Sequence, residues 1–364
     1  MTTDRRQGMF DPTTLLTALP ALLGFIPERS IILIAFAADD SICATMRHDL
    51  VLTPAGAPHR SMPVLLRELG EICVRYAATS VLLVIVDDRY PGDDPRYRRI
   101  AAVADRHLAA SGGVYAAFFA DDLTEGRPWR TIWHPTDDLD RFPPPIVMPA
   151  GVDEAGFVRD PHTSATAMRE AITSGRRILA KRSEMVAMLS ETEHCDNRHH
   201  PDPDGVAEQS NSPRPSGELL QFVFDQVLAP SSALDCATVR TLERAITTLE
   251  VRDGLLALSV TDHRAAVEEL WRQLARRLRG SGRASAATLL AHLHYVGGDG
   301  AYAGVALDCA LTADPHWTLA TLLDRALRAG LHPDVVMWPM VDDSYEVAAR
   351  LGVQLPAITM RDAG

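Results

Sequence analysis

Two pairs of neighbouring carboxylates follow apolar runs that predict buried strands. One pair comes directly after residues 81–86 and the other just after residues 114–119, and the four residues are Asp87, Asp88, Asp121 and Asp122. In open α/β sheets, ligands bind beyond the carboxyl ends of the strands. Carboxylate oxygens suit Mg²⁺, which would bring a phosphate group with it. The alternative is that these aspartates only form turns and cap the helices that follow.

A compact group of cationic and aromatic residues comes shortly after the second pair. Its members are Arg127, Trp129, Arg130 and His134. An arginine acting with an aspartate can hold a phosphate or a carboxylate through two parallel hydrogen bonds. The alternative is a β-hairpin that packs the tryptophan in the core and leaves the arginines in solvent. These four residues and the four aspartates are the candidate ligand-binding residues of the first half.

A glycine-rich turn in the second half is a further candidate, this time for an anion. Gly298, Asp299 and Gly300 lie between two predicted helices. The simplest interpretation is that one helix ends and the next begins, with glycine allowing a positive φ and Asp299 capping the new helix. The alternative is that the N-terminus of the new helix binds an anion.

Other kinds of chemistry have little support. No predicted strand is followed by a glycine-rich phosphate loop, and no serine nucleophile elbow is present. Histidines, aspartates and a cysteine cluster in residues 194–202, but this is the most polar part of the chain, and a zinc site needs an ordered scaffold. We therefore predict no metal site there, and Mg²⁺ at the aspartate pairs is the one cofactor that the sequence suggests.

The pattern of the first half predicts an α/β domain with a mixed sheet flanked by helices. Continuous apolar runs predict strands buried on both faces, and alternation in residues 42–50 predicts an antiparallel partner. A helix between the two later runs predicts that they pair in parallel through a right-handed crossover. The expected strands are 31–38, 42–50, 81–86, 114–119 and 129–133. The expected helices are 12–23 between Asp11 and Gly24, 59–76, 95–110, 164–173 and 183–189 capped by Ser183.

A polar segment rich in Pro, Asp, Asn and Ser separates the two halves, and it cannot bury enough surface to order itself. We expect an α/β domain over 1–192, a flexible linker over 193–217 and a helical domain over 218–364. Short alanine-rich segments in the last part predict an all-α domain of helical hairpins, similar to repeat proteins. Its expected helices are 218–228, 236–248, 254–258, 265–278, 286–296, 301–312 and 319–329.

The bulk composition narrows the class of protein. The 364 residues include 36 Lys and Arg and 48 Asp and Glu, which gives a formal net charge of −12 and argues against a nucleic-acid binder. The longest apolar runs are too short to span a bilayer, and the polar N-terminus does not resemble a secretory signal. Five scattered cysteines predict no disulfide framework and a reducing compartment. We expect a cytoplasmic protein with neither nucleic acid nor membrane as a partner.

Two sequence blocks carry a resemblance to a known family. They are LLGFIPERSIIL at residues 22–33 and GDGAYAGVALD at 298–308, the second continuing to Asp314-Pro315. Together they resemble an actinobacterial family catalogued as a domain of unknown function, of the DUF4192 type, over about residues 15–333. The resemblance implies an actinobacterial cytoplasmic protein and brings no activity. Relatives often carry clustered cysteines after a Trp-Arg pair, here Trp129 and Arg130, whereas residues 131–136 contain none. A metal site at that cluster would be lost in this chain.

Three functions remain open on these observations. The first is a binding module that takes a protein partner on the helical domain or a small ligand. The second is a metal-dependent hydrolase or phosphotransfer enzyme for a small phosphorylated or nucleotide-like substrate, with Asp87, Asp88 and Asp121 on the metal and Arg130 on the anion. The third is a ligand sensor that signals through the helical half.

Overall fold

The protein folds as two compact units, Met1–Glu184 and Met185–Gly364. The structure, a computed structural model, describes residues 11–134, 155–173, 176–192, 214–228 and 234–360. We call the two parts the N-terminal unit and the helical unit.

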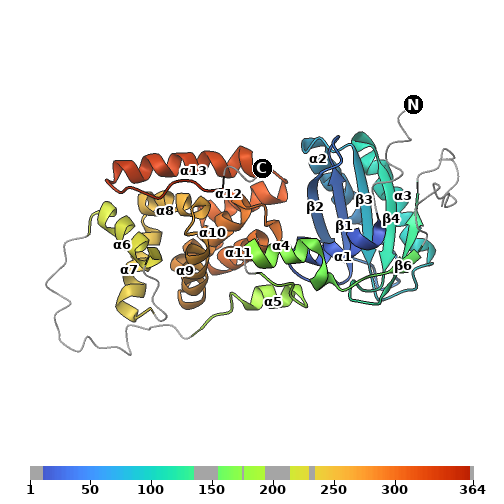
Figure 1. The fold of residues 1–364 in the computed structure, drawn as a ribbon, viewed down its shortest axis with the longest axis horizontal. Coiled ribbons are helices and arrows are strands. Elements are labelled where there is room, and N and C mark those ends of the chain that lie inside the picture. Colours follow the sequence, from blue (N-terminus) through green and yellow to red (C-terminus); the bar gives the residue numbers. More distant parts are fainter. Residues whose placement is uncertain (1–10, 135–154, 174–175, 193–213, 229–233, 361–364) are drawn as a thin grey trace. The chain divides into compact units, whose positions relative to one another are not determined.

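A six-stranded mixed sheet forms the centre of the N-terminal unit (Figure 1). The strands lie in the order β2-β1-β3-β4-β5-β6, and β3 and β4 run parallel while every other neighbouring pair is antiparallel. The bounds are β1 Ser30–Phe36, β2 Ile42–Asp49, β3 Ser80–Val86, β4 Val114–Ala120, β5 Pro128–Trp133 and β6 Ala155–Phe157. The five predicted strands and the parallel pair are confirmed. The sequence missed β6, because three residues are too few to show an alternating pattern.

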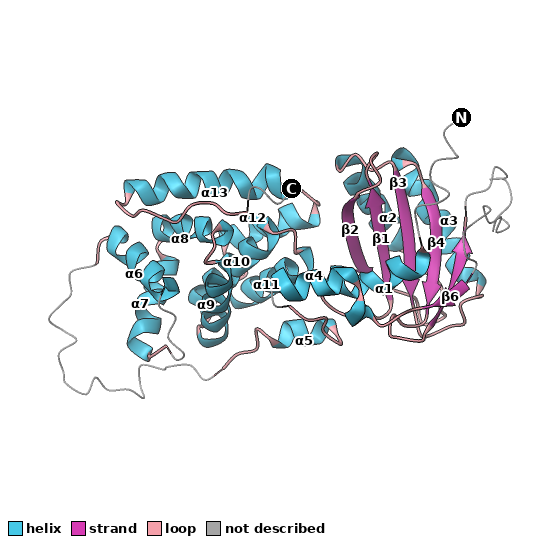
Figure 2. Ribbon diagram, in the orientation of Figure 1, coloured by secondary structure: helices cyan, strands magenta, loops and turns pink. Residues whose placement is uncertain are grey.

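Helices cover both faces of this sheet, as the wholly buried strands β1 and β3 require. Helices α2 (Met62–Arg75) and α3 (Pro95–Leu108) share one hydrophobic core with the inward residues of β1, β3 and β4. Helix α1 (Pro12–Leu23) lies across the opposite face (Figure 2). Its predicted ends are confirmed, since the Asp11 carboxylate accepts from the backbone of Thr13 at 3.0 Å and Gly24 adopts φ 79°.

Gly112, in the turn before β4, is a position where only glycine fits. Its φ is +83°, and a Cβ there would lie 2.0 Å from the carbonyl oxygen of Thr79. We expect Gly112→Ala to lower the free energy of unfolding by about 2 kcal/mol, measured by urea denaturation. Gly126→Ala is the matched control, because Gly126 has φ +78° with nothing within 4 Å of its Cβ position, and it should lose only about 1 kcal/mol. If the two variants lost equal free energies of unfolding, the clash with the Thr79 carbonyl would not be the reason that Gly112 must be glycine.

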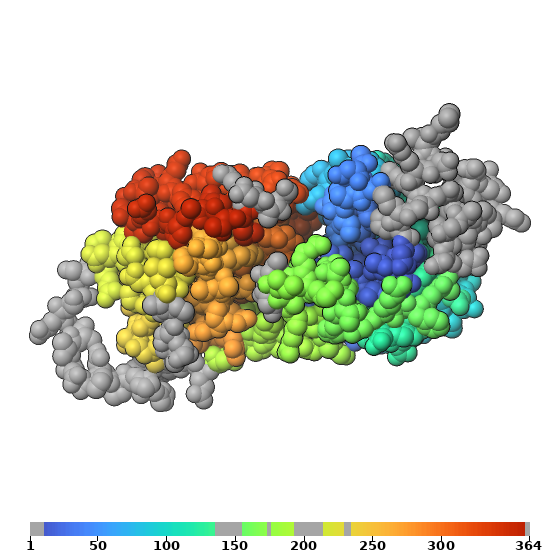
Figure 3. Space-filling model, viewed as in Figure 1, coloured from blue at the N-terminus to red at the C-terminus, as the bar shows by residue number. Residues whose placement is uncertain are grey.

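The helical unit is built around α10 (Gly280–Val296), in which residues on all sides are buried. A helix that is apolar all round must be enclosed by neighbours, and α10 packs against α7, α9, α11, α12 and α13. Helix α13 (Pro333–Arg350) lies over α8 and forms part of the surface in Figure 3. The other helices are α6 Ser216–Leu228, α7 Cys236–Thr247, α8 Leu249–Leu255, α9 Arg264–Arg277, α11 Gly300–Ala313 and α12 Thr318–Arg328.

The predicted helical second half is confirmed in the residues that the structure describes, with differences in detail. Helix α13 was not predicted, because it contains Pro339, which interrupts a helical pattern in sequence. Helix α5 (Arg182–Ala187) begins one residue earlier than expected, so the prediction that Ser183 is its N-cap is wrong. Helix α4 (Ala165–Thr173) lies where it was expected. Most of the expected linker lies outside the described residues, while Ser216 and Gly217 already belong to α6.

Three arginines hold a short stretch of chain, residues 189–192, against the helical unit. Arg276 donates to the carbonyl of Ser190 at 3.3 Å. Arg279 donates to the carbonyl of Thr192 at 2.8 Å, and Arg283 donates to that of Leu189 at 2.9 Å. The stretch is thereby fixed at the end of α9 and the start of α10.

Two further expectations concern the whole chain. No helix in the described residues is both long enough and apolar enough to cross a bilayer. Cys43, Cys73 and Cys309 are free thiols, whereas Cys236 is disulfide-bonded. The sequence predicted no disulfide framework and gave no sign of this single bond at Cys236, which cysteine spacing alone could not have shown.

Candidate ligand-binding site

A cleft of about 640 Å³ opens at the edge of the sheet where β3 and β4 end. We call it the larger cleft. The loop after β3, the end of β4, the first residues of β5 and all of β6 form its walls. The residues that line it are Asp88, Arg89, Tyr90, Pro91, Gly92, Asp93, Phe119, Asp121, Pro128, Trp129, Arg130, Ala155, Gly156 and Phe157. One aspartate of each candidate pair, Asp88 and Asp121, lines this cleft.

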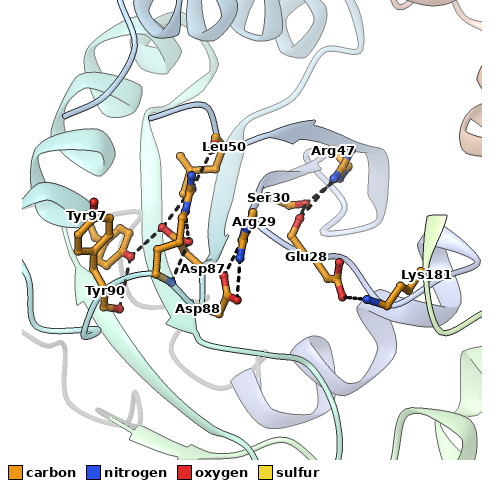
Figure 4. Close-up of polar contacts among 11 residues, drawn as sticks. Glu28, Arg29, Ser30, Arg47, Leu50, Asp87, Asp88, Tyr90, Tyr97 and Lys181 are labelled. Carbon is orange, nitrogen blue, oxygen red and sulfur yellow. Dashed lines mark hydrogen bonds and ion pairs between the residues drawn. The ribbon is translucent and has the colours of Figure 1, made fainter. Parts of the chain in front are cut away.

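Asp87 holds an arginine in place. Its side chain is 0 % exposed, and its carboxylate accepts from Arg89 Nε at 2.6 Å and from the Tyr97 hydroxyl at 2.9 Å (Figure 4). Burial and this hydrogen bond raise the pKa of Tyr97. Arg89 also donates to the carbonyl of Leu50 at 2.9 Å. Both carboxylate oxygens of Asp87 are used by the protein, so the Asp87–Asp88 pair does not present four free oxygens to a metal ion.

The other three aspartates also have protein partners. Asp88 pairs with Arg29 through two hydrogen bonds of 2.7 and 3.1 Å, and the Arg29 guanidinium lowers the pKa of Asp88. Asp121 lies 3.6 Å from Arg127, and Asp122 accepts from the backbone of Thr124 at 3.1 Å, which is a turn contact. Within the described ranges, no three His, Cys, Asp or Glu side chains converge as metal ligands. The predicted Mg²⁺ site therefore has no matching ligand set in this part of the chain.

The cationic and aromatic residues around Trp129 do not all lie in one place: some pack in the core and some face the cleft. Trp129 is buried, its indole donates to Thr13 at 3.1 Å, and it meets Phe118 edge to face at 5.7 Å between ring centroids. The hairpin interpretation of this group is thereby confirmed for the tryptophan. His134 packs against the ring of Tyr115 instead and does not line the cleft.

Arg130 is exposed in the larger cleft. Its Cδ lies only 3.3 Å from where a Cβ at Gly92 would be, so the stem of the arginine runs along the glycine. Its guanidinium makes no hydrogen bond or ion pair with any other residue that the structure describes. The cleft therefore contains a positioned cation, Arg130, that has no protein partner in the part of the chain that the structure describes.

Sequence reasoning missed the aromatic wall of the cleft. Tyr90 is fixed by Arg96, whose guanidinium lies 3.3 Å from the centroid of the tyrosine ring. Phe157, on β6, is 66 % exposed. Gly92 lets the loop approach Phe119 closely, because a Cβ would lie 2.5 Å from that ring. The turn-forming pair Pro91-Gly92, which follows Tyr90 in the loop after β3, is the signal that could have located this loop.

A second hollow of about 390 Å³ lies at the same edge, where β1 begins and β2 ends. We call it the basic hollow. It shares only Arg89 with the larger cleft. Its lining residues are Phe25, Ile26, Glu28, Arg29, Arg47, Asp49, Leu50, Arg89, Lys181, Arg182 and Ser183.

The glycine-rich turn of the helical unit differs from its prediction. Gly298 adopts φ +80° and Gly300 begins α11, as expected. Asp299 occupies the N-cap position but makes no side-chain hydrogen bond to the first turn. Its carboxylate lies 3.8 Å from Arg264 and 3.9 Å from His294 instead. The predicted cap is wrong because these cationic and titratable neighbours attract the carboxylate away from the helix.

Comparison with known proteins gives a family and no activity. A family model described as Domain of unknown function (DUF4192) matches residues 12–334. No curated protein and no solved structure matches the chain. The matched range agrees with the resemblance noted in the sequence, while the actinobacterial origin stays a prediction.

Proposed function

The chain belongs to the DUF4192 family, whose function is unknown, and we propose that its N-terminal unit binds a small organic anion with a flat ring in the larger cleft. The observation that carries the proposal is the guanidinium of Arg130, which no described residue pairs with, beside an aromatic wall. A guanidinium recognises carboxylates and phosphates through paired hydrogen bonds. Aromatic side chains stack on planar ligand rings.

The shape and lining of the cleft support a ligand of nucleotide-like size. Its volume of about 640 Å³ lies in the range of small-molecule sites. Asp93 and Asp121 line it and supply acceptors for amino or hydroxyl groups of a ring. The proposal gives no role to a metal ion, because Asp87 is committed to Arg89 and Tyr97.

Binding of the four ribonucleoside 5′-monophosphates by ligand-observed NMR and calorimetry tests this proposal. We expect at least one to bind the full chain, and Arg130→Gln to weaken that binding about tenfold or more, the effect of one charged hydrogen-bonding pair. Arg99→Gln removes an exposed arginine of α3 outside the cleft and should leave the affinity unchanged. Absence of binding for all four, or equal affinity in the Arg130 variant, would reject the proposal.

The remaining roles suggested by the sequence stay predictions. A protein partner on the helical unit, a ligand-sensor role and a cytoplasmic location are such predictions.

A further inference from the structure

We propose that the basic hollow binds a phosphate group, either of inorganic phosphate or of a phosphomonoester. Its lining cations are Arg29, Arg47, Arg89, Lys181 and Arg182. Only two carboxylates, Glu28 and Asp49, line it with them, so the lining carries a net charge of +3 in a chain whose net charge is −12. A local excess of cations in an acidic protein concentrates anions at that place.

Two carboxylates that do not line the hollow, the buried Asp87 and the exposed Asp88, hold two of these cations in fixed positions. Asp87 fixes Arg89 by the 2.6 Å contact to Nε, and Asp88 fixes Arg29 by contacts to Nε and Nη2 (Figure 4). Neither aspartate lines the hollow. The pairs therefore order the guanidiniums, and when these two carboxylates are counted the five cations and four carboxylates of the cluster keep a net charge of +1.

Arg47 and Lys181 are held by the two carboxylates of the lining. Arg47 lies 2.6 Å from Asp49 and donates to the Ser30 hydroxyl at 2.8 Å, and its side chain is only 17 % exposed. Lys181 lies 3.0 Å from Glu28 (Figure 4). Burial lowers the pKa of Arg47, and the nearby Arg182 cation acts in the same direction. A bound anion would relieve this crowding of positive charge.

Each of the three paired guanidiniums keeps hydrogen-bonding capacity for a ligand. Arg29, Arg47 and Arg89 use Nε and Nη2 for their protein partners, and Nη1 of each makes no hydrogen bond with any described residue. An arginine has five N–H donors in a fixed fork, so two or three remain on each. Donors from three separate segments suit a tetrahedral oxyanion, which accepts from several directions, better than a planar carboxylate.

The backbone at Arg29 supports the same assignment. Its φ of 44° lies in the left-handed region, which is costly for a residue other than glycine. Such a conformation persists where the surrounding contacts impose it, and here these are the Asp88 pair and the start of β1. Strained residues of this kind concentrate at ligand sites.

Titration of the full chain with inorganic phosphate and with glycerol 1-phosphate, at fixed ionic strength, tests the proposal by calorimetry and ³¹P NMR. We expect saturable binding, weakened about tenfold by Arg29→Gln and further by Arg29→Gln combined with Lys181→Gln. Both side chains are more than half exposed, at 57 % and 58 %, so the variants should fold, which circular dichroism checks. Tighter binding of the ester identifies a phosphorylated metabolite as the occupant, and tighter binding of the free ion identifies phosphate; both support the site.

Two control variants separate this site from general charge effects and from the larger cleft. Arg75→Gln removes an exposed arginine at the end of α2, outside the hollow, and should not change phosphate affinity. Arg99→Gln, which lies outside both cavities, should also leave phosphate affinity unchanged. The ring-anion site is tested by nucleotide binding in Arg130→Gln and this site by phosphate binding in Arg29→Gln, so failure of one is distinguishable from failure of the other. The proposal is overturned if neither anion binds the wild-type chain, or if the double variant binds phosphate as tightly as the wild type.

Discussion

Asp87→Asn is expected to lower the free energy of unfolding of the N-terminal unit by about 3 kcal/mol. The carboxylate is 0 % exposed and holds the Arg89 guanidinium, so the substitution leaves a cation without its anion next to the core. Removal of one member of a fully buried pair costs about 3 to 5 kcal/mol. We take the lower end of this range because the Arg89 side chain is 26 % exposed and can be rehydrated.

Asp88→Asn is the matched control for this prediction. Asp88 is the next residue and also pairs with an arginine, but both partners are more than half exposed. An exposed pair contributes about 1 kcal/mol or less. Urea denaturation measures both losses, and hydrogen exchange of the β3 and β4 amides localises them. If the two variants lose the same stability, the buried pair does not have the structural role assigned to it.

This result affects how any activity of the protein is interpreted. If an Asp87 variant lost function, the loss could be taken as evidence for a metal-binding aspartate. Here the loss would be explained equally well because Arg89 is no longer held in place by the Asp87 carboxylate. Function should therefore be tested first at Arg130 and Arg29, whose exposed side chains do not support the core.

Acidification should destabilise the helical unit through His292. This residue lies on α10 and is wholly buried, and neither ring nitrogen makes a hydrogen bond of normal geometry within the described residues, although the Met337 backbone is close enough to favour the protonated ring slightly. Burial, with the Arg264 cation in addition, lowers the pKa of His292 from 6.5 to about 3. The folded state therefore keeps the ring neutral at pH values where the unfolded chain already binds a proton.

The direction of the pH effect follows from this difference. Between pH 6.5 and pH 3 the unfolded state holds one more proton, so the free energy of unfolding falls as the pH falls. The slope is about 1.4 kcal/mol per pH unit, which amounts to about 3 kcal/mol at two units below the pKa of the unfolded chain.

His292→Leu should remove this part of the pH dependence. We expect the variant to be at least as stable as the wild type near neutral pH, because it no longer buries two poorly satisfied ring nitrogens. His316→Gln, at an exposed position between α11 and α12, should retain the wild-type pH dependence. Urea denaturation followed by helical circular dichroism over this pH range makes the comparison. An unchanged slope in the His292 variant would mean that the ring is already protonated in the folded unit.

Local patterns predicted most of the fold because they reflect burial. The unbroken apolar runs of β1 and β3 allow little other than a strand covered on both faces. The ends of α1 were predictable because Asp11 and Gly24 act on the backbone within a few residues. The same approach failed for β6, which has too few residues for a period, and for α13, whose Pro339 resembles a helix end.

The candidate site was predictable in its position and not in its chemistry. Strand ends placed Asp87 and Asp88 at the correct edge of the sheet. Their partners lie at very different distances along the chain, from Arg89 two residues away to Arg29 fifty-nine residues away. No spacing rule links these positions, so a single sequence could not show that the carboxylates hold arginines. The composition of the basic hollow depends even more on the fold. Lys181, the residue just before α5, lines it although it lies far along the chain from the strands that form the rest of the hollow.

The attachment of residues 189–192 determines where the protein can be cut. A fragment that starts at Glu218 leaves the guanidiniums of Arg276, Arg279 and Arg283 without the carbonyl acceptors they use in the whole chain. A fragment that starts at Met185 retains all three acceptors and coincides with the boundary of the compact unit. Recombinant production of the helical half should therefore include the eight residues that precede the polar segment, even though they form little regular structure of their own.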